Sequence, residues 1–206
     1  MERQLALVAL MAALTAALGL IPTFTLPFGV PITAQTMGIM LCGTILGSRL
    51  GALAALLFIG LVALGLPLLA GGRGGLGLFF GPSAGFLLGW PLAAYFAGRT
   101  MEAMKVGSVF FRAAWAAVFG GMIVLYMPGI VGMAITLDLA IGEASILSAA
   151  FLPGDLAKAG LAGAVTAFLA RVRPESVLSL TSTGWCPAVS MFALARRWFT
   201  GAFRKK

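Results

Sequence analysis

Long apolar runs, separated by short polar or Pro- and Gly-rich segments, make up most of this chain. A bilayer core about 30 Å thick is crossed by a helix of roughly 20 mostly apolar residues, and most of the runs approach that length. The pattern therefore predicts an all-α integral membrane protein with six transmembrane helices joined by short loops. The predicted helices cover residues 5–20, 33–46, 50–69, 82–97, 113–135 and 153–170.

The composition agrees with a single membrane domain. Of the 206 residues, 61% are hydrophobic and 10% are charged, whereas an ordinary soluble domain has roughly 25% charged residues. The first apolar run follows an early charge, as in a signal peptide, but lacks a clear small-x-small cleavage site, so we interpret it as the first membrane helix. We assign residues 1–173 to the membrane domain. Residues 174–206, which end in basic and aromatic residues, are expected to form a basic cytoplasmic tail with an amphipathic surface helix.

The formal net charge of +8 indicates membrane topology rather than binding to nucleic acid, because the Lys and Arg residues interrupt apolar runs and form no stripe beside stacking aromatic residues. With six crossings, nearly all connector cations fall on the side that holds both termini: Arg3, Arg49, Arg99, Lys105, Arg112, Arg171 and Arg173. Cytoplasmic loops are enriched in Lys and Arg. We therefore expect both termini in the cytoplasm, a multi-pass plasma (inner) membrane location, a polar connector at residues 99–112, and Arg73 outside.

Three segments rich in Gly or Pro converge on the external face in this topology: residues 27–35, 71–82 and 152–158. Irregular backbone at membrane depth is tolerated only where protein buries it or where it lines a cavity. Asp155 and Lys158 lie three residues apart on a predicted helix, so they share a face and can pair. Ionisable residues within a span are costly and usually line a site or pathway. The alternative is a structural ion pair that locks the sixth helix against its neighbours.

Other residues near this face each have two interpretations. Arg73 lies among glycines that let backbone approach a ligand, or it is a solvated loop charge. Thr33, Gln35 and Thr36 offer hydroxyl and amide groups to a ligand, or they cap a helix. On the first helix, small residues at four-residue spacing form a ridge that permits close approach of another helix, and internal packing is the simpler explanation. This ridge consists of Ala9, Ala13 and Ala17.

Several classes of function are disfavoured by the residues that the sequence lacks. The chain has no His, and its two Cys residues, Cys42 and Cys186, lie far apart. We therefore expect no metal site, no disulfide framework and no enzyme active site. The glycine-rich segment around Arg73 lacks the Lys-Ser/Thr that completes a phosphate-binding loop. The chain is accordingly expected to have no cofactor and no ATP site.

Four motifs occur in and around the converging segments: Val30-Pro-Ile-Thr-x-Gln35, Ala70-Gly-Gly-Arg-Gly-Gly-Leu-Gly77, Gly81-Pro-x-x-Gly85-Phe and Leu152-Pro-Gly-Asp-x-x-Lys158. In this combination and order they resemble the BioY family, the biotin-specific substrate-binding (S) subunits of energy-coupling factor (ECF) transporters. The resemblance implies an ECF S-component-like bundle that captures biotin from outside with high affinity. It implies a lid between the first two helices, here residues 22–31, with Phe28 and Val30.

The resemblance also implies partners. A transmembrane coupling subunit would contact the ridge of Ala9, Ala13 and Ala17. Two ATPase subunits would supply the ATP hydrolysis that topples the binding subunit and releases biotin inside. The remaining expected partners are biotin itself and membrane lipid.

The chemistry of biotin agrees with the candidate residues. Its ureido group has two N–H donors and a carbonyl acceptor, its bicycle is apolar, and its tail ends in a carboxylate. Asp155 can accept from an N–H, whereas Lys158, Arg73 or Gln35 can donate to the carbonyl or the carboxylate. The other expected substrate-binding residues are Thr33, Gly72, Gly75, Gly77 and Phe79. Two further hypotheses stay open: a binding subunit for another vitamin, and a proton-coupled small-solute carrier that uses Asp155 and Lys158.

Overall fold

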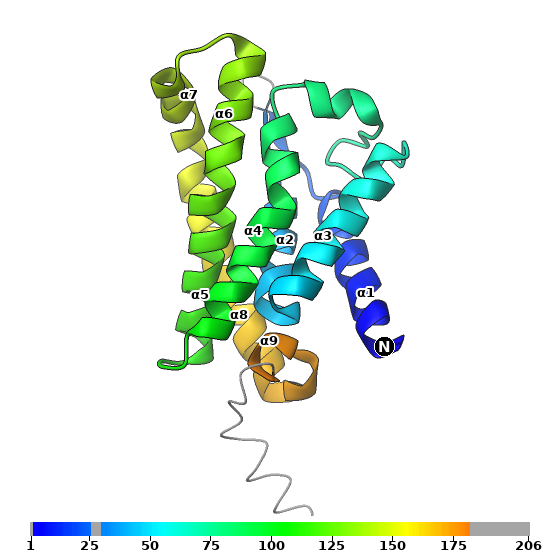
Figure 1. The fold of residues 1–206 in the computed structure, drawn as a ribbon, viewed down its shortest axis with the longest axis vertical. Helices are drawn as coiled ribbons and strands as arrows, with labels where there is room; N and C mark the ends of the chain where they lie inside the picture. Colours follow the sequence, from blue (N-terminus) through cyan, green and yellow to red (C-terminus); the bar gives the residue numbers. More distant parts are fainter. Residues whose placement is uncertain (1, 26–29, 182–206) are drawn as a thin grey trace, which may run out of the picture.

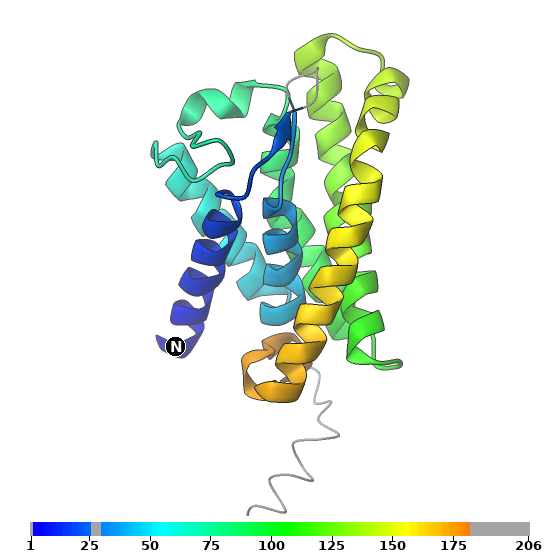
Figure 2. The ribbon, with the colours of Figure 1, turned by 180° about the vertical axis from the view of Figure 1, so that it is seen from behind.

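The computed structural model describes residues 2–25 and 30–181, which form a bundle of helices running up and down (Figures 1 and 2). Its principal helices are α1 (Glu2–Leu18), α2 (Gln35–Leu46), α3 (Ser48–Ala63), α4 (Ala84–Ala103), α5 (Val109–Val118), α6 (Leu125–Leu137) and α8 (Leu152–Val172). The helix α4 is central, packing against α2, α3 and α6. Large apolar side chains such as Leu56, Leu88 and Phe168 are exposed on the outer faces, as expected of a protein surrounded by lipid.

One continuous helix, residues Val109–Leu137, joins α5 and α6 through a π-helical segment, η2 (Phe119–Val124). Judged by length and composition, it is the one helix within the described ranges 2–25 and 30–181 that is long and apolar enough to cross a membrane. Pro128 lies inside α6, where it removes a backbone N–H donor. Both departures from regular α-helix lie near Tyr126, which lines the cavity described below.

Helices occur where each of the six crossings is predicted, but α2 and α3 are shorter than a span. At about 1.5 Å per residue, α2 covers only part of a bilayer core. The chain before it is irregular, with β1 (Phe24–Thr25) paired antiparallel to β2 (Pro31–Ile32). The prediction that the third helix reaches residue 69 is wrong, because Gly65 adopts a φ of 98° and α3 ends at Ala63.

Two further boundaries differ from the sequence prediction. Arg99 and Glu102 belong to α4 and not to a polar connector, which is confined to the few residues between α4 and α5. Glu102 there accepts hydrogen bonds from the backbone N–H of Ser48, at 2.8 Å, and from its hydroxyl, so it caps the start of α3. The chain also forms an extra short helix, α7 (Ile141–Ser148), and a 3₁₀ turn, η3 (Ala149–Phe151), before α8.

The two ends of the bundle differ in character. The end that holds the β1–β2 pair, residues 64–83 and α7 is here called the loop end (Figure 1). The N-terminus, the α2–α3 turn, the α4–α5 connection and the end of α8 lie at the opposite end (Figure 2). Most of the cations that the sequence assigns to one side of the membrane lie in these four segments, and Arg99 and Arg112 lie on the helical turns next to the α4–α5 connection. Arg73 lies at the loop end.

The first residues of the predicted tail pack on the bundle. They form η4 (Pro174–Ser176) and α9 (Leu178–Thr181), and α9 contacts α2 and α4. Val177 and Ser179 are buried, and the Ser179 hydroxyl donates to the Thr44 carbonyl. The amphipathic helix expected further along falls in residues 182–206, outside the described residues.

Candidate substrate-binding site

A cavity opens among α2, α4, α6 and α8 near the loop end. Its lining combines a few polar groups with a larger apolar surface. The lining residues are Val30, Pro31, Ile32, Thr33, Gln35, Thr36, Leu69, Arg73, Ser83, Phe86, Leu87, Trp90, Leu125, Tyr126, Phe151, Asp155 and Lys158.

The predicted pairing of Asp155 and Lys158 is confirmed. The Lys158 Nζ lies 2.8 Å from the Asp155 Oδ1, and the side chains are only 15% and 5% exposed, respectively. Both residues lie near the start of α8, whose Pro153 occupies an early position where the missing N–H costs nothing. The helical spacing of three residues brings them to one face, and that face lines the cavity.

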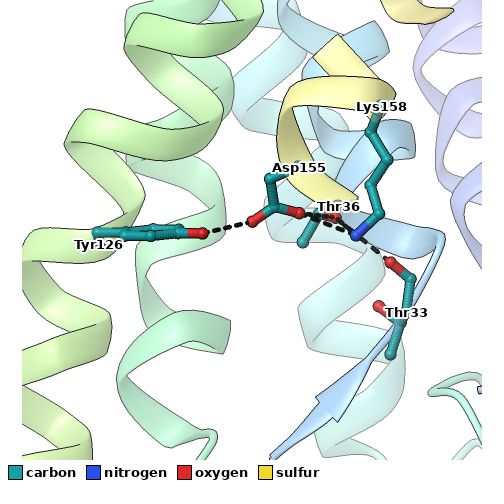
Figure 3. A network of polar contacts seen from close by, with 5 residues as sticks. All are labelled: Thr33, Thr36, Tyr126, Asp155 and Lys158. Carbon is teal, nitrogen blue, oxygen red and sulfur yellow. Dashed lines mark hydrogen bonds and ion pairs between the residues drawn. The ribbon is translucent and has the colours of Figure 1, made fainter. Parts of the chain in front are cut away.

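Two residues from other helices complete a polar network around this pair (Figure 3). The Tyr126 hydroxyl, from α6, donates to the Asp155 Oδ2 at 2.8 Å. The Lys158 ammonium donates to the Thr36 Oγ1, from α2, at 3.0 Å. Three helices thus meet at one carboxylate. A buried ion pair is tolerated when further hydrogen bonds satisfy its remaining atoms, and Tyr126 and Thr36 do so here.

Sequence reasoning did not identify Tyr126 as a site residue and gave Thr36 only as a possible polar partner. The signal for Tyr126 was weak, since a single tyrosine in an apolar helix is usually interfacial or in the core. Thr33 also lines the cavity, and its carbonyl lies 3.4 Å from the Thr36 hydroxyl.

Arg73 lines the cavity from the segment between α3 and α4. Its backbone forms an antiparallel bridge with Leu69, and its Nε donates to the Ala70 carbonyl at 3.1 Å. Gly71, Gly72 and Gly75 around it have positive φ values of 78°, 69° and 98°. Such backbone favours glycine, and it lets the chain turn back so that Arg73 reaches the cavity.

Gln35 lines the cavity, yet its amide is committed to the protein backbone. The side chain is fully buried. Its Nε2 donates to the carbonyls of Thr15 and Leu68, at 3.2 and 2.9 Å, and its Oε1 accepts from the Ala70 N–H at 3.0 Å. The expectation that Gln35 donates to the ligand is therefore wrong for this arrangement, because both of its N–H groups are already used.

The remaining residues that were expected to contact the ligand differ in whether they line the cavity. Val30 of the predicted lid is buried and lines the cavity, whereas Phe28 lies outside the described residues. Four residues expected beside the ligand do not line the cavity: Gly72, Gly75, Gly77 and Phe79. Gly72 and Gly75 act instead on the shape of the segment that carries Arg73.

Four aromatic residues contribute to the apolar lining: Phe86, Trp90, Tyr126 and Phe151. The Phe86 ring makes edge contacts with Tyr126 and Phe151, at centroid distances of 6.1 and 5.9 Å, and the Trp90 ring lies 5.6 Å from that of Phe58. Glycines hold the helices behind these rings close together, since a Cβ on Gly132 of α6 would lie 2.6 Å from the Gly85 Cα of α4. The contact of α4 with α6 thereby fixes how far Phe86 stands from Tyr126.

Ala9, Ala13 and Ala17 are all exposed on the outer face of α1. The interpretation of this ridge as internal packing is thus wrong for the described part of the chain. A smooth exposed face on an apolar helix suits contact with a further membrane helix.

An apolar helical bundle that encloses a cavity with a few buried polar groups defines a solute-binding membrane protein. Comparison of the sequence with protein families identifies the group: the BioY family matches residues 2–175, and the chain belongs to this family. A biotin transporter BioY from Rhodobacter capsulatus is 45% identical over 188 residues, which cover 87% of this chain and 99% of that protein. A probable biotin transporter BioY from Bacillus subtilis is 43% identical, over 85% of this chain and 92% of that protein.

The fold has a match among solved structures. The crystal structure at 2.1 Å of the S-component for biotin from an ECF-type ABC transporter superposes with a TM-score of 0.78 and 29% identity, covering 82% of this chain and 92% of that chain. The predicted all-α, ECF S-component-like fold is therefore confirmed.

Proposed function

We propose that this chain binds biotin with high affinity in the cavity described above and takes part in its uptake as the substrate-specific subunit of an ECF-type transporter. The observation that carries the proposal is the network of Asp155, Lys158 and Tyr126. It places a buried carboxylate and an ammonium in the cavity of a chain from the BioY family. The relatives called biotin transporters and the structure of an S-component for biotin support the choice of ligand.

The polar groups suggest an orientation for the ligand. Asp155, the one carboxylate among the described lining residues, accepts from a ureido N–H. Lys158 has three N–H donors, of which two contact Asp155 and Thr36, so the third donates to the ureido carbonyl. Arg73 faces the carboxylate at the end of the biotin side chain. Among the described residues, only its Nε is engaged, by the Ala70 carbonyl, so its terminal N–H groups can donate to that carboxylate.

Charge and shape complement this orientation. The charged lining residues are Arg73, Asp155 and Lys158, and two positive charges minus one negative charge leave one positive charge for the single carboxylate of biotin. The apolar bicycle lies against Phe86, Trp90 and the neighbouring apolar residues.

We place the protein in the plasma membrane with the loop end outside. Support comes from the cations at the end of the bundle that lies opposite the cavity. The exposed ridge of Ala9, Ala13 and Ala17 contacts the transmembrane coupling subunit. Two ATPase subunits supply the energy, because this chain carries no phosphate-binding loop of its own.

Equilibrium binding of biotin to the purified protein in detergent tests the proposal. Biotinamide, which lacks the carboxylate, measures the contribution of Arg73, and thiamine and riboflavin are the control vitamins. We expect tight binding of biotin, weaker binding of biotinamide and no stabilisation by the controls in a thermal-shift assay, where only a true ligand stabilises by mass action. Failure of the folded protein to bind biotin would refute the proposal, and stabilisation by a control vitamin would redirect it.

Uptake in cells separates the proposal from the carrier hypothesis. We expect biotin uptake to stop when the ATPase subunits are absent. Uptake that continues without them, and that collapses when a protonophore removes the proton gradient, would instead support a proton-coupled carrier.

A further inference from the structure

The buried carboxamide of Gln35 contacts three separate segments of backbone at the loop end. Its Nε2 donates to the Thr15 carbonyl of α1 and to the Leu68 carbonyl after α3, and its Oε1 accepts from the Ala70 N–H. A glutamine amide has two N–H donors, and both are engaged here. The side chain is wholly buried at the first residue of α2.

The contact with Thr15 caps the end of α1. The last carbonyls of a helix have no partner within it. Near the end of α1, the N–H groups of Gly19 and Leu20 satisfy Ala16 and Ala17, and Gln35 satisfies Thr15. Gly19 permits this approach, because a Cβ there would lie only 2.8 Å from the Gln35 Nε2.

The contact with Ala70 leads directly to Arg73. The N–H of Ala70 donates to Gln35 at 3.0 Å, and the carbonyl of the same residue accepts from the Arg73 Nε at 3.1 Å. Ala70 is buried, and the backbone bridge between Leu69 and Arg73 closes the turn between them. The position of the Arg73 guanidinium therefore depends on Ala70, whose backbone N–H is held by Gln35.

We propose that Gln35 is a positioning residue, which holds the 68–73 segment so that Arg73 faces the ligand carboxylate, and that Gln35 is not itself a donor to the ligand. This inference rests on the proposed function for the identity of the ligand. The effect of Gln35 on the segment itself does not depend on any ligand. The same side chain also links the pocket to the end of α1.

Gln35→Met tests the inference, since methionine has a similar volume and lacks the polar groups. Arg73→Ala is the reference variant, and Gln4→Met, at an exposed glutamine of α1, is the matched control. The readout is the ratio of the Kd for biotinamide to the Kd for biotin. We expect the wild type and Gln4→Met to prefer biotin about tenfold or more, as one charge-assisted hydrogen bond implies. Both Gln35→Met and Arg73→Ala should lose that preference.

A general loss of folding would weaken both ligands equally and leave the ratio unchanged, so an unchanged ratio in Gln35→Met overturns the inference. Gln35→Leu also lacks the polar groups and adds no charge, and it serves as the second variant if the methionine variant does not fold. It should lose the preference for biotin in the same way.

Hydrogen exchange without ligand keeps this test independent of biotin. We expect Gln35→Met to speed exchange in peptides that cover residues 66–73, where the Ala70 N–H loses its acceptor, and to leave peptides of α8 unchanged. Unaltered exchange in residues 66–73 would contradict the inference even if biotin binds as proposed. If the wild type does not prefer biotin to its amide, the assignment of Arg73 fails, while the exchange result still reports on Gln35.

Discussion

Replacing Asp155 by Asn tests whether the polar network binds the ligand or merely locks α8. The change keeps the shape of the side chain but removes the charge that pairs with Lys158 at 2.8 Å and accepts from Tyr126 at 2.8 Å. An amide N–H would also oppose a ureido N–H of biotin. A lost charge-assisted hydrogen bond costs about 1.5–3 kcal/mol, which raises the Kd by a factor of about 10 to 150.

The same change lowers stability, because Lys158 stays behind as a largely buried cation. Breaking a buried pair from one side costs about 3–5 kcal/mol, and the 15% exposure of the Lys158 side chain places the expected loss toward the lower figure. Isothermal titration with biotin, well below the unfolding temperature, separates the two effects, since unfolded protein lowers the stoichiometry and not the affinity. Asp138→Asn is the matched control, because Asp138 is an exposed carboxylate at the loop end, away from the cavity.

A double variant sharpens the distinction. Asp155→Asn combined with Lys158→Met removes both charges, so it should recover part of the lost stability. It should remain a weak binder, since neither polar contact returns. A wild-type Kd in Asp155→Asn, or recovery of affinity together with stability in the double variant, would show that the pair is only a structural lock.

Tyr126→Phe removes a hydrogen bond to the Asp155 carboxylate, so biotin affinity measured by titration should fall about tenfold with little change in expression; a wild-type Kd would exclude Tyr126 from the site. Gly132→Ala places a methyl group against the Gly85 backbone, and we expect a loss of about 1–3 kcal/mol, visible as a lower unfolding temperature; unchanged thermal unfolding would contradict the close helix contact. Ala13→Leu enlarges the exposed ridge on α1, so ATP-dependent uptake in cells should fall while the Kd for biotin in detergent stays the same; normal uptake would remove this face as the partner contact.

The sequence predicts the parts of the site that local geometry determines. Helical pitch alone brings Asp155 and Lys158 to one face, and the structure confirms their pairing. The contacts that cross the bundle could not be inferred, since Tyr126 and Thr36 lie 29 and 119 residues from Asp155 in sequence. Helix packing, which no local pattern specifies, brings them together.

Gln35 shows a different limit of sequence reasoning. The sequence offers it as a ligand partner or a helix cap, whereas the structure gives it three backbone partners. Those partners are backbone groups 20, 33 and 35 residues away, and a side-chain pattern carries no information about which backbone groups lack hydrogen bonds. The ends of helices show a related limit: Arg99 and Glu102 suggested a connector, yet charged residues continue a helix readily where it leaves the apolar core.

The set of charges in the cavity has a consequence for the electrical work of transport. Arg73, Asp155 and Lys158 line the cavity, and together with the carboxylate of biotin they sum to zero. Moving one elementary charge across a membrane potential involves about 2.3 kcal/mol per 100 mV. In the toppling motion that the ECF resemblance implies, the loaded cavity would cross the membrane with no electrical work. The empty cavity, with one positive charge, would return outward against an inside-negative potential, which makes the return of the empty subunit the voltage-sensitive step of the cycle.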